Sequence, residues 1–384
     1  MATKFFDIAR RNKSDEFYTQ WVDIENEVQA YVKFNPNVFR NKTVLCPCDD
    51  PYESNFFKYF VSCFNDVGLK KLIATYYIGS PVADAPLSLF ADESGDDKAT
   101  RAPHKIEIAE VDDSGAGDAA DLSDVKRLLA NKKNALTRLR GDGDFRSGEI
   151  RALRDEADFI ITNPPFSLFR DFITWITEVK KQFLVISNMN AITYKEVFPQ
   201  IKDNRMWMGL GFGRSFQGFI VPKHYPLNGS EARIDEQGNR IVSTNNTIWL
   251  TNIDHGHRHQ PLQLMTMEEN LKFSRHEKIK NRNRYDRYDN YDAIEVPFTD
   301  AIPSDYDGVM GVPISFLHKY CPEQFEIIKF RTGDDEKDLS IGGKCPYFRI
   351  LIKHKRGKHP SPRRTRPNVE TLANGAKEFA ELRY

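Results

Sequence analysis

One tetrapeptide combines groups that could activate a nitrogen atom for group transfer. Asn163, Pro164, Pro165 and Phe166 follow directly after an apolar run at residues 159–161. In an open α/β sheet, ligands bind beyond the carboxyl ends of the strands, so a catalytic loop belongs at such a place. The two prolines fix the backbone and remove competing N–H donors. An ordinary strand-ending turn is the alternative, and the strand before it and the helical pattern after it argue against that interpretation.

The exocyclic amine of adenine poses the problem that these residues would solve. The amine is a poor nucleophile because its lone pair is delocalised into the ring. The Asn163 side-chain oxygen and the Pro164 carbonyl could accept its two hydrogens, which favours a pyramidal nitrogen with an exposed lone pair. The Phe166 ring could stack on a base extruded from a duplex. A sulfonium methyl donor is strongly electrophilic, so positioning can supply much of the rate without a covalent nucleophile.

Alternating strand and helix patterns surround the tetrapeptide. Apolar runs at 43–48 and 71–78 flank an amphipathic stretch at 56–64, which predicts a βαβ unit. A helical period at 168–182 and a strand pattern at 183–188 follow the tetrapeptide, and one further strand is expected at 241–253. This alternation predicts an α/β fold with a parallel sheet and right-handed crossovers.

Charge supports a nucleic-acid partner only locally. Lys+Arg and Asp+Glu both number 55 in the 384 residues, so the net charge is zero. Residues 272–287 are strongly basic and are accompanied by Tyr285, Tyr288 and Tyr291, which suits phosphate contact and base stacking. A solvated surface segment is the alternative. The candidate DNA-binding residues in this stretch are Lys278, Lys280, Arg282 and Arg284.

Other features narrow the class of protein. Residues 82–121 are acidic, which predicts a solvated loop or β-ribbon on the surface. Cys46 and Cys48 lack the spacing of a structural zinc site and are expected in the core. The histidine-rich segment 254–259 could face DNA, and it lacks a distant ligand pair, so no metal is expected. The chain shows no signal-peptide pattern and no run of about 18 apolar residues, which predicts a soluble, cytoplasmic protein without membrane partners.

The chain resembles the EcoRI-type adenine-specific DNA methyltransferase family. The resemblance implies a Rossmann-like core that uses S-adenosylmethionine as methyl donor, a C-terminal target-recognition region and N6-methyladenine in double-stranded DNA as product. It also implies a possible cognate restriction endonuclease that acts on the same site. The similar stretches are residues 15–25, 44–56, 141–145, 163–166, 247–252 and 311–326.

The resemblance also places the cofactor. Most amino-methyltransferases with this tetrapeptide carry a glycine-rich loop after the first strand, but here that place has no glycine and ends in acidic groups. Asp49 or Asp50 could contact the cationic amino end of the donor, and the other aspartate could cap the next helix. By analogy, the Asp144 carboxylate would accept from the cofactor adenine and the Phe145 ring would pack on it. The remaining candidate cofactor residues are Tyr18, Pro47 and Cys48.

These inferences divide the chain into three parts. Residues 1–222 are expected to form the catalytic core, 223–350 the target-recognition region and 351–384 a basic tail. Two alternatives remain open at this point. One is a methyltransferase of the same chemistry that acts on RNA or on a protein glutamine, and the other is a catalytically silent DNA-binding module.

Overall fold

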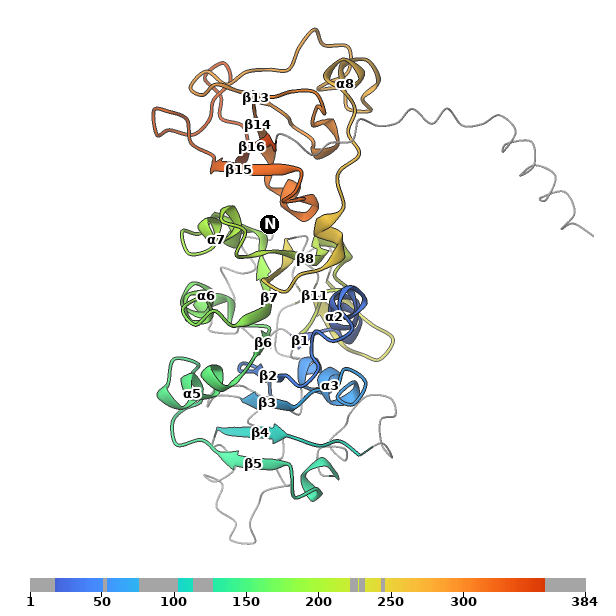
Figure 1. Ribbon diagram of the computed structural model, residues 1–384, viewed down its shortest axis with the longest axis vertical. Coiled ribbons are helices and arrows are strands. Elements are labelled where there is room, and N and C mark those ends of the chain that lie inside the picture. Colours follow the sequence, from blue (N-terminus) through green and yellow to red (C-terminus); the bar gives the residue numbers. More distant parts are fainter. Residues whose placement is uncertain are drawn as a thin grey trace, which may run out of the picture.

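The computed structural model describes residues 18–50, 54–75, 103–112, 127–221, 227, 232–242 and 246–355. Within these ranges a central eight-stranded sheet has the order β5-β4-β3-β2-β6-β7-β12-β8 (Figure 1). Its strands are β2 (Thr43–Cys46), β3 (Lys71–Thr75), β4 (His104–Ile108), β5 (Ala135–Arg138), β6 (Phe159–Thr162), β7 (Gln182–Asn188), β8 (Trp207–Phe212) and β12 (Thr247–Thr251).

Helices cover both faces of the central sheet. One face carries α5 (Gly148–Glu156), α6 (Phe169–Thr177) and α7 (Phe198–Lys202), and the other carries α2 (Trp21–Phe34) and α3 (Asn55–Ser62) (Figure 1). Because side chains alternate along a strand, Leu45 and Ile160 pack on the first face while Val44 and Phe159 pack on the second. This double burial explains why the central strands are continuous apolar runs. The predicted α/β fold is confirmed.

The four central strands, β3, β2, β6 and β7, run parallel to one another. Their outer neighbours β4 and β12 are antiparallel to them, so the sheet is mixed and not wholly parallel as predicted. The predicted βαβ unit is confirmed as β2, α3 and β3. The prediction of a surface loop or ribbon for residues 82–121 is wrong for the part that the structure describes, because β4 pairs with β3 inside the central sheet. Ile106 and Ile108 of β4 are fully buried, since their side chains complete the apolar face against α3. The remainder of the predicted insertion lies outside the described residues.

A second, antiparallel sheet has the order β1-β9-β11-β10. The single strand expected at 241–253 is two strands in different sheets, because β11 ends at Val242 and β12 begins at Thr247. Since β12 lies between β7 and β8, the central sheet extends past the predicted core boundary at residue 222. The strands of this sheet are β1 (Tyr18–Thr19), β9 (Phe219–Val221), β10 (Ala232–Ile234) and β11 (Arg240–Val242).

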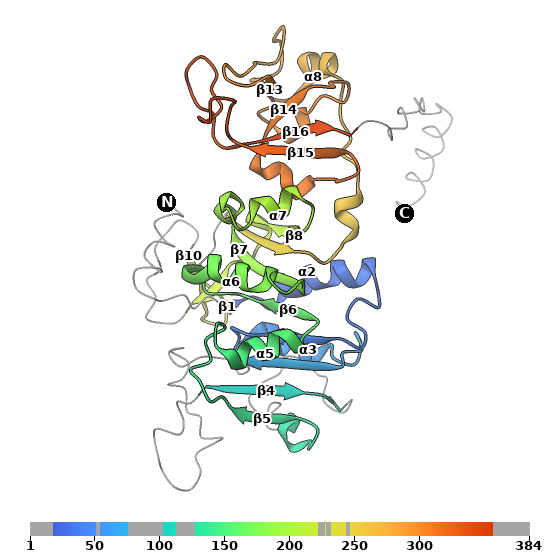
Figure 2. The ribbon, with the colours of Figure 1, turned by 60° about the vertical axis from the view of Figure 1, so that its left-hand side comes forward.

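Residues 260–355, here the C-terminal unit, form a third sheet of order β13-β14-β16-β15 at one end of the molecule (Figure 2). The rings of Phe198 in α7 and Phe330 in β15 lie 5.0 Å apart, so apolar packing joins this unit to the core. The residues from 351 to 354, expected in the basic tail, belong to a paired strand. The elements of the unit are α8 (Met267–Phe273), β13 (Ala293–Glu295), β14 (Val309–Pro313), β15 (Phe325–Phe330) and β16 (Arg349–His354).

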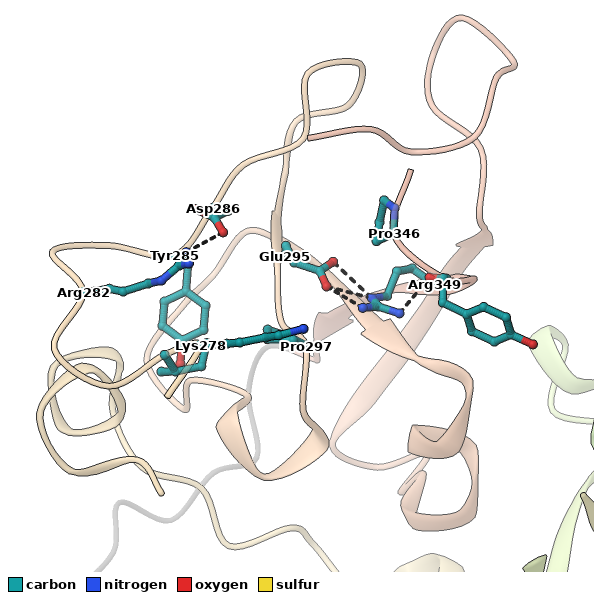
Figure 3. Close-up of a pocket in the computed structure, with 10 residues that line it drawn as sticks. Lys278, Arg282, Tyr285, Asp286, Glu295, Pro297, Pro346 and Arg349 are labelled. Atoms are coloured by element: carbon teal, nitrogen blue, oxygen red, sulfur yellow. Dashed lines mark hydrogen bonds and ion pairs between the residues drawn. The ribbon is translucent and has the colours of Figure 1, made fainter. Parts of the chain in front are cut away.

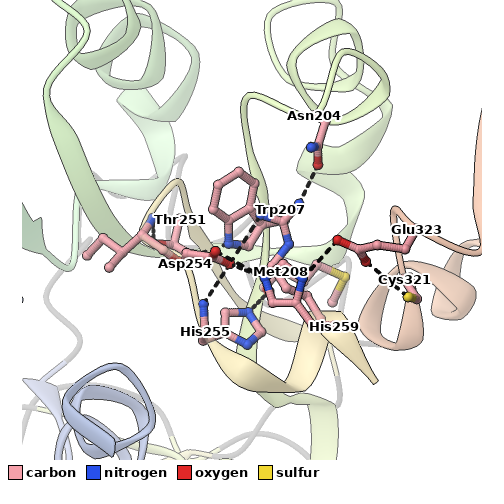
Figure 4. A network of polar contacts seen from close by, with 11 residues as sticks. Asn204, Trp207, Met208, Thr251, Asp254, His255, His259, Cys321 and Glu323 are labelled. Carbon is pink, nitrogen blue, oxygen red and sulfur yellow. Dashed lines mark hydrogen bonds and ion pairs between the residues drawn. The ribbon is translucent and has the colours of Figure 1, made fainter. Parts of the chain in front are cut away.

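The histidine-rich segment 254–259 forms a polar joint between the core and the C-terminal unit (Figure 4). The His259 ring lies 2.8 Å from Asp254 Oδ1 and 2.9 Å from Glu323 Oε1. Burial lowers the pKa of His259, but its hydrogen bonds to both carboxylates outweigh that effect and raise it. Arg258 is buried over the Trp207 ring. These side chains therefore contribute to packing between the core and the C-terminal unit, and the DNA-facing role of this loop stays a prediction.

Two further findings concern the cysteines and membranes. Cys46 is buried in the core as predicted, Cys48 is half-buried, and both are free thiols. The described ranges contain no group of three or more residues suited to hold a metal ion. They also contain no helix with the length and apolar character that crossing a bilayer requires.

Candidate active site

The strand order places the predicted halves of the site at one edge of the central sheet, where β2 and β6 are neighbours. From β2 the chain continues to β3 and β4 on one side of the sheet, whereas β6 and β7 lie on the other side. The strand order therefore reverses between β2 and β6, and ligands in open α/β sheets bind at the carboxyl ends of the strands beside such a reversal. The predicted catalytic tetrapeptide follows β6 at this edge, and the predicted cofactor turn follows β2.

The tetrapeptide leaves the sheet directly after Thr162. Pro164 is buried, Asn163 is half-buried, and the Asn163 Oδ1 atom is itself buried. A short 3-10 helix begins at Phe166 and leads into α6. The Phe166 ring is half-buried and meets the Phe219 ring edge-on at 6.3 Å. The structure thus brings the four predicted residues to the strand end and places β9 beside them.

A buried aspartate joins the cofactor turn to this strand end. Asp49 is only 5% exposed. Its Oδ1 atom accepts a 2.6 Å hydrogen bond from Ser54 Oγ, and its Oδ2 atom accepts one from Thr162 Oγ1. Burial raises the pKa of Asp49 to about 7, although both hydroxyl bonds lower it. Ser54 caps α3, since its side chain accepts from the Phe56 backbone N–H. Asp49 therefore links β2, α3 and β6.

The other residues of the turn form hydrogen bonds through their backbone carbonyls. Pro47 presents its carbonyl to the Thr75 hydroxyl of β3 at 3.0 Å. Asp50 is half-buried, and its backbone carbonyl accepts from the Ser54 N–H at 2.7 Å. Both aspartates therefore contact the helix cap Ser54, Asp50 through its backbone carbonyl and Asp49 through its side chain.

Asp144 lies close to the cofactor turn, but Phe145 has a different role from the predicted one. Burial raises the pKa of Cys48, and the charges of Asp49 and Asp144 raise it further. Arg146 donates to both oxygens of Asp144, at 2.9 and 2.6 Å, which lowers the pKa of that carboxyl.

The Phe145 ring is buried against Phe172 and Trp175, at 5.0 and 5.6 Å. The predicted packing of this ring on the cofactor adenine is therefore wrong for this conformation, because core neighbours already surround it.

The described N-terminal segment reaches the same edge. Tyr18 and Thr19 form β1, which pairs with β9, and Asn55 Nδ2 donates to the Thr19 carbonyl at 2.8 Å. Since Asn55 is the first residue of α3, this bond fixes β1 beside the helix N-terminus. The Thr19 hydroxyl is buried, and nothing in the described part of the chain forms a hydrogen bond with it. Tyr18 is half-buried, as a residue that lines a site would be.

Sequence reasoning missed four polar side chains at this edge. Three of them adjoin a predicted site residue, since Thr162 precedes Asn163, Thr19 follows Tyr18 and Arg146 follows Phe145. This adjacency is a signal that could have identified them. The missed residues are Thr19, Ser54, Thr162 and Arg146.

The predicted DNA-binding residues lie elsewhere, on the C-terminal unit. All four are exposed, whereas Tyr285 and Tyr288 are buried. Tyr285 donates to the Ala301 carbonyl at 2.7 Å, and Tyr288 donates to Glu295. These two rings are consequently unavailable for base stacking, which corrects the prediction. The exposed rings of the unit are instead Phe273 and Tyr347, at 62% and 71% exposure.

The basic stretch contains two kinds of cation. Acids of the same unit hold three of them in ion pairs: Arg275, Arg282 and Arg287. The four others form no ion pair with any residue that the structure describes: Lys272, Lys278, Lys280 and Arg284. Lys278 and Arg282 also line a cavity of about 460 Å³ (Figure 3). Its far wall holds Tyr347 and the buried ion pair of Arg349 with Glu295.

Comparison with known proteins adds independent evidence. Residues 5–355 match the family described as adenine-specific methyltransferase EcoRI. The chain is 49% identical over 348 residues to the type II methyltransferase M.EcoRI of Escherichia coli, covering 91% of this chain and 95% of that protein. It is 32% identical over 369 residues to the type II methyltransferase M.MpnI of Mycoplasma pneumoniae, covering 91% and 98%. No solved structure matches significantly. The chain therefore belongs to the EcoRI family of adenine-specific DNA methyltransferases.

Proposed function

We propose that this enzyme transfers a methyl group from S-adenosylmethionine to N6 of an adenine extruded from double-stranded DNA, at the carboxyl ends of β2 and β6. A hydrogen bond connects the predicted cofactor turn to the strand that carries the catalytic tetrapeptide, and this contact is the main support for the proposal. The predicted cofactor turn and the catalytic tetrapeptide follow neighbouring strands, and Asp49 of the turn accepts from Thr162, the residue before Asn163.

The residues at this edge fit the proposed cofactor. A methyl donor of this kind carries an ammonium group, a carboxylate and hydroxyls, and when bound it supplies a methyl group activated by a sulfonium. The Asp50 carboxylate suits the ammonium group, because a charge-assisted hydrogen bond is stronger than a neutral one. The buried Thr19 hydroxyl is a polar group that a ligand would satisfy, since such groups rarely lack partners. Tyr18 and Asp144 would line the same space.

The chain's own groups then prepare the target amine. Asn163 Oδ1 and the Pro164 carbonyl would accept its two hydrogens and orient the lone pair toward the methyl group. Phe166 would stack on the extruded base, where the edge of Phe219 supports its ring. Burial of this strand end excludes water and strengthens each polar contact.

The proposal extends to the type of core and to a partner enzyme. The parallel run β3-β2-β6-β7, with β12 antiparallel beside β7, supports a Rossmann-like core. This core extends through β12, so the target-recognition region begins after the polar joint and corresponds to the C-terminal unit. A restriction endonuclease that acts on the same DNA site would be a natural partner, because the similar proteins from two bacteria are named type II methyltransferases.

Methyl transfer from labelled donor tests the substrate class. Purified enzyme would be given DNA, RNA and protein in parallel, and the methylated adenines would then be mapped by sequencing. We expect label in DNA alone, at N6 of adenine within one short sequence. Label in RNA or in a protein glutamine would contradict the proposal, and tight cofactor binding without any transfer would indicate a silent DNA-binding protein.

Removing the Phe166 ring should weaken the hold on the extruded base. Phe166→Ala is expected to cost about 1–3 kcal/mol, the range for one base–aromatic stack. Phe166→Tyr and Phe166→Trp keep a ring and should retain much of the activity. A fluorescent adenine analogue at the target position measures extrusion, because it brightens when it leaves the helix. Equal brightening with wild type and the alanine variant would remove Phe166 from this role.

The C-terminal unit offers a surface suited to the DNA backbone. Lys278, Lys280 and Arg284 are exposed cations without an acid partner in the described ranges, so their charge is available to phosphates. The exposed Tyr347 ring lines the adjacent cavity, and an aromatic face beside cations is a typical feature of nucleotide contact.

The salt dependence of binding tests this surface. Replacing Lys278, Lys280, Arg282 and Arg284 by Gln should flatten the slope of log affinity against log salt, by about 0.9 for each phosphate that the variant no longer neutralises. Arg282 is paired with Asp286, so the change in slope is expected mainly from Lys278, Lys280 and Arg284. The control replaces Arg275 and Arg287 by Gln, because their charges are likewise already paired, with Asp300 and Asp292. This control should change the slope much less. Identical slopes for the quadruple variant and wild type would show that the stretch is only a solvated surface.

A further inference from the structure

The hydrogen bond between Thr162 and Asp49 lies directly beside the proposed catalytic residue Asn163. Thr162 is fully buried, and its peptide continues directly into Asn163. The other oxygen of Asp49 holds Ser54, the cap of α3, at 2.6 Å. One buried carboxylate therefore connects the end of the catalytic strand to the helix that begins behind the cofactor turn.

We propose that Asp49 is a positioning residue, which acts through Thr162 to fix the orientation of Asn163 relative to the cofactor turn. The inference rests on the proposed function, because it assigns Asn163 to the target amine. Both oxygens of Asp49 are bonded within the protein, to Ser54 and Thr162, so we expect it to act on the chemical step and not on cofactor affinity.

The physical reason is the precision that methyl transfer demands. A displacement of about 1 Å in a reacting group can reduce turnover by about 100-fold. Backbone pairing holds β6 only to its end, and Asn163 lies beyond the last paired residue, Thr162. The bond from the Thr162 side chain adds a restraint at the point where the sheet no longer provides one. Bonds to an ionised carboxylate are short and directional, which suits this task.

The positioning role of Asp49 also predicts that turnover depends on pH, because the carboxyl can gain or lose a proton. Burial raises the pKa of Asp49 to about 7, so the carboxyl titrates near neutral pH. The charged and titratable groups around it are Asp50, Cys46 and Cys48 on its own segment, and Asp144 acts on Cys48 from the loop before α5. The ionised form is the stronger acceptor for both hydroxyls, and protonation weakens this pair of bonds because one oxygen then carries a hydrogen. Turnover should accordingly rise as pH increases through about 7, and Asp49→Asn should remove that inflection.

Three variants and one double variant test the proposal. Thr162→Val keeps the shape but loses the hydroxyl, Thr162→Ser keeps the hydroxyl, and Asp49→Asn can accept at only one of the two positions. We expect the valine and asparagine variants to lose about 10- to 100-fold in kcat. S-adenosylmethionine affinity, measured by calorimetry, should change by less than about threefold in these variants, since the contact touches no ligand. The serine variant should stay within about threefold of wild-type kcat.

The double variant, Asp49→Asn with Thr162→Val, should lose no more than the worse single variant, because both remove the same contact. Thermal melting of each variant separates folding from chemistry. A valine variant that melts lower but turns over like wild type would overturn the proposal, as would additive losses in the double variant. If wild type methylates DNA in the same assay, such a failure concerns Asp49 alone. An inactive wild type would instead refute the proposed function, and this inference with it.

Discussion

Asn163→Ala is expected to reduce kcat by roughly 100-fold or more, the scale of losing one preorganised polar contact in a transition state. The Asn163 Oδ1 atom is buried at the carboxyl end of β6, where water cannot readily replace it as an acceptor. Alanine cannot accept from the target amine, so the nitrogen lone pair would stay delocalised into the adenine ring. The loss should fall on kcat, because the contact strengthens only as the nitrogen becomes pyramidal.

Single-turnover methyl transfer into DNA measures this loss without interference from product release. Asn163→Asp is the matched control, since a carboxylate oxygen of the same reach can still accept, and it should retain measurable activity. Calorimetry should show nearly unchanged S-adenosylmethionine affinity in both variants. A turnover near that of wild type in the alanine variant would exclude Asn163 from the mechanism. A large loss of cofactor affinity would show that Asn163 contacts the methyl donor and not the target adenine.

The parts of this site that local patterns encode could be predicted from the sequence. Continuous apolar runs identify the buried parallel strands, and the tetrapeptide identifies the end of one of them. The proposed meeting of the two substrates then follows from topology, because neighbouring parallel strands end at the same edge. Asn163 and the turn at residues 47–50 could therefore be placed together before the structure was known.

Contacts between distant residues could not be predicted in this way. Asp49 and Thr162 are 113 positions apart, and nothing in the local pattern shows that one carboxylate spans two strand ends. For Phe145 the family resemblance predicted a contact with the cofactor adenine. In the structure its ring packs against Phe172 and Trp175 instead. The motif fixed its place along the chain, but the direction of its ring depends on how α6 packs.

Amino-acid composition alone also failed to predict which residues of the charged segments are buried. An acidic window predicted exposure for residues 82–121, yet His104–Ile108 form a strand, since alternate residues there are apolar. In the basic stretch, the alternation of charge and tyrosine suggested stacking. The fold buries two of those tyrosines, because each hydroxyl has an internal acceptor. Aromatic rings next to charges are therefore ambiguous until burial is known.

Asp50→Asn should weaken S-adenosylmethionine binding by about 1.5–3 kcal/mol, the range for a hydrogen bond to a charged group. This corresponds to a roughly 10- to 150-fold rise in Kd. Asp50 is half-buried in the turn after β2, and its backbone carbonyl accepts from Ser54 at the N-terminus of α3, so we expect its carboxylate beside the bound donor. Asparagine keeps the shape of the side chain but removes the charge that would attract the ammonium group.

Asp49→Asn provides the contrast, because the two aspartates are neighbours with opposite expected effects. Its oxygens are engaged by Ser54 and Thr162, so this change should lower turnover while cofactor affinity is retained. Calorimetric titration of both variants beside kinetic assays therefore separates binding from positioning. If Asp50→Asn binds the donor as tightly as wild type, the ammonium group is held by another residue. Loss of affinity in Asp49→Asn alone would reverse the two assignments and move the cofactor deeper toward β6.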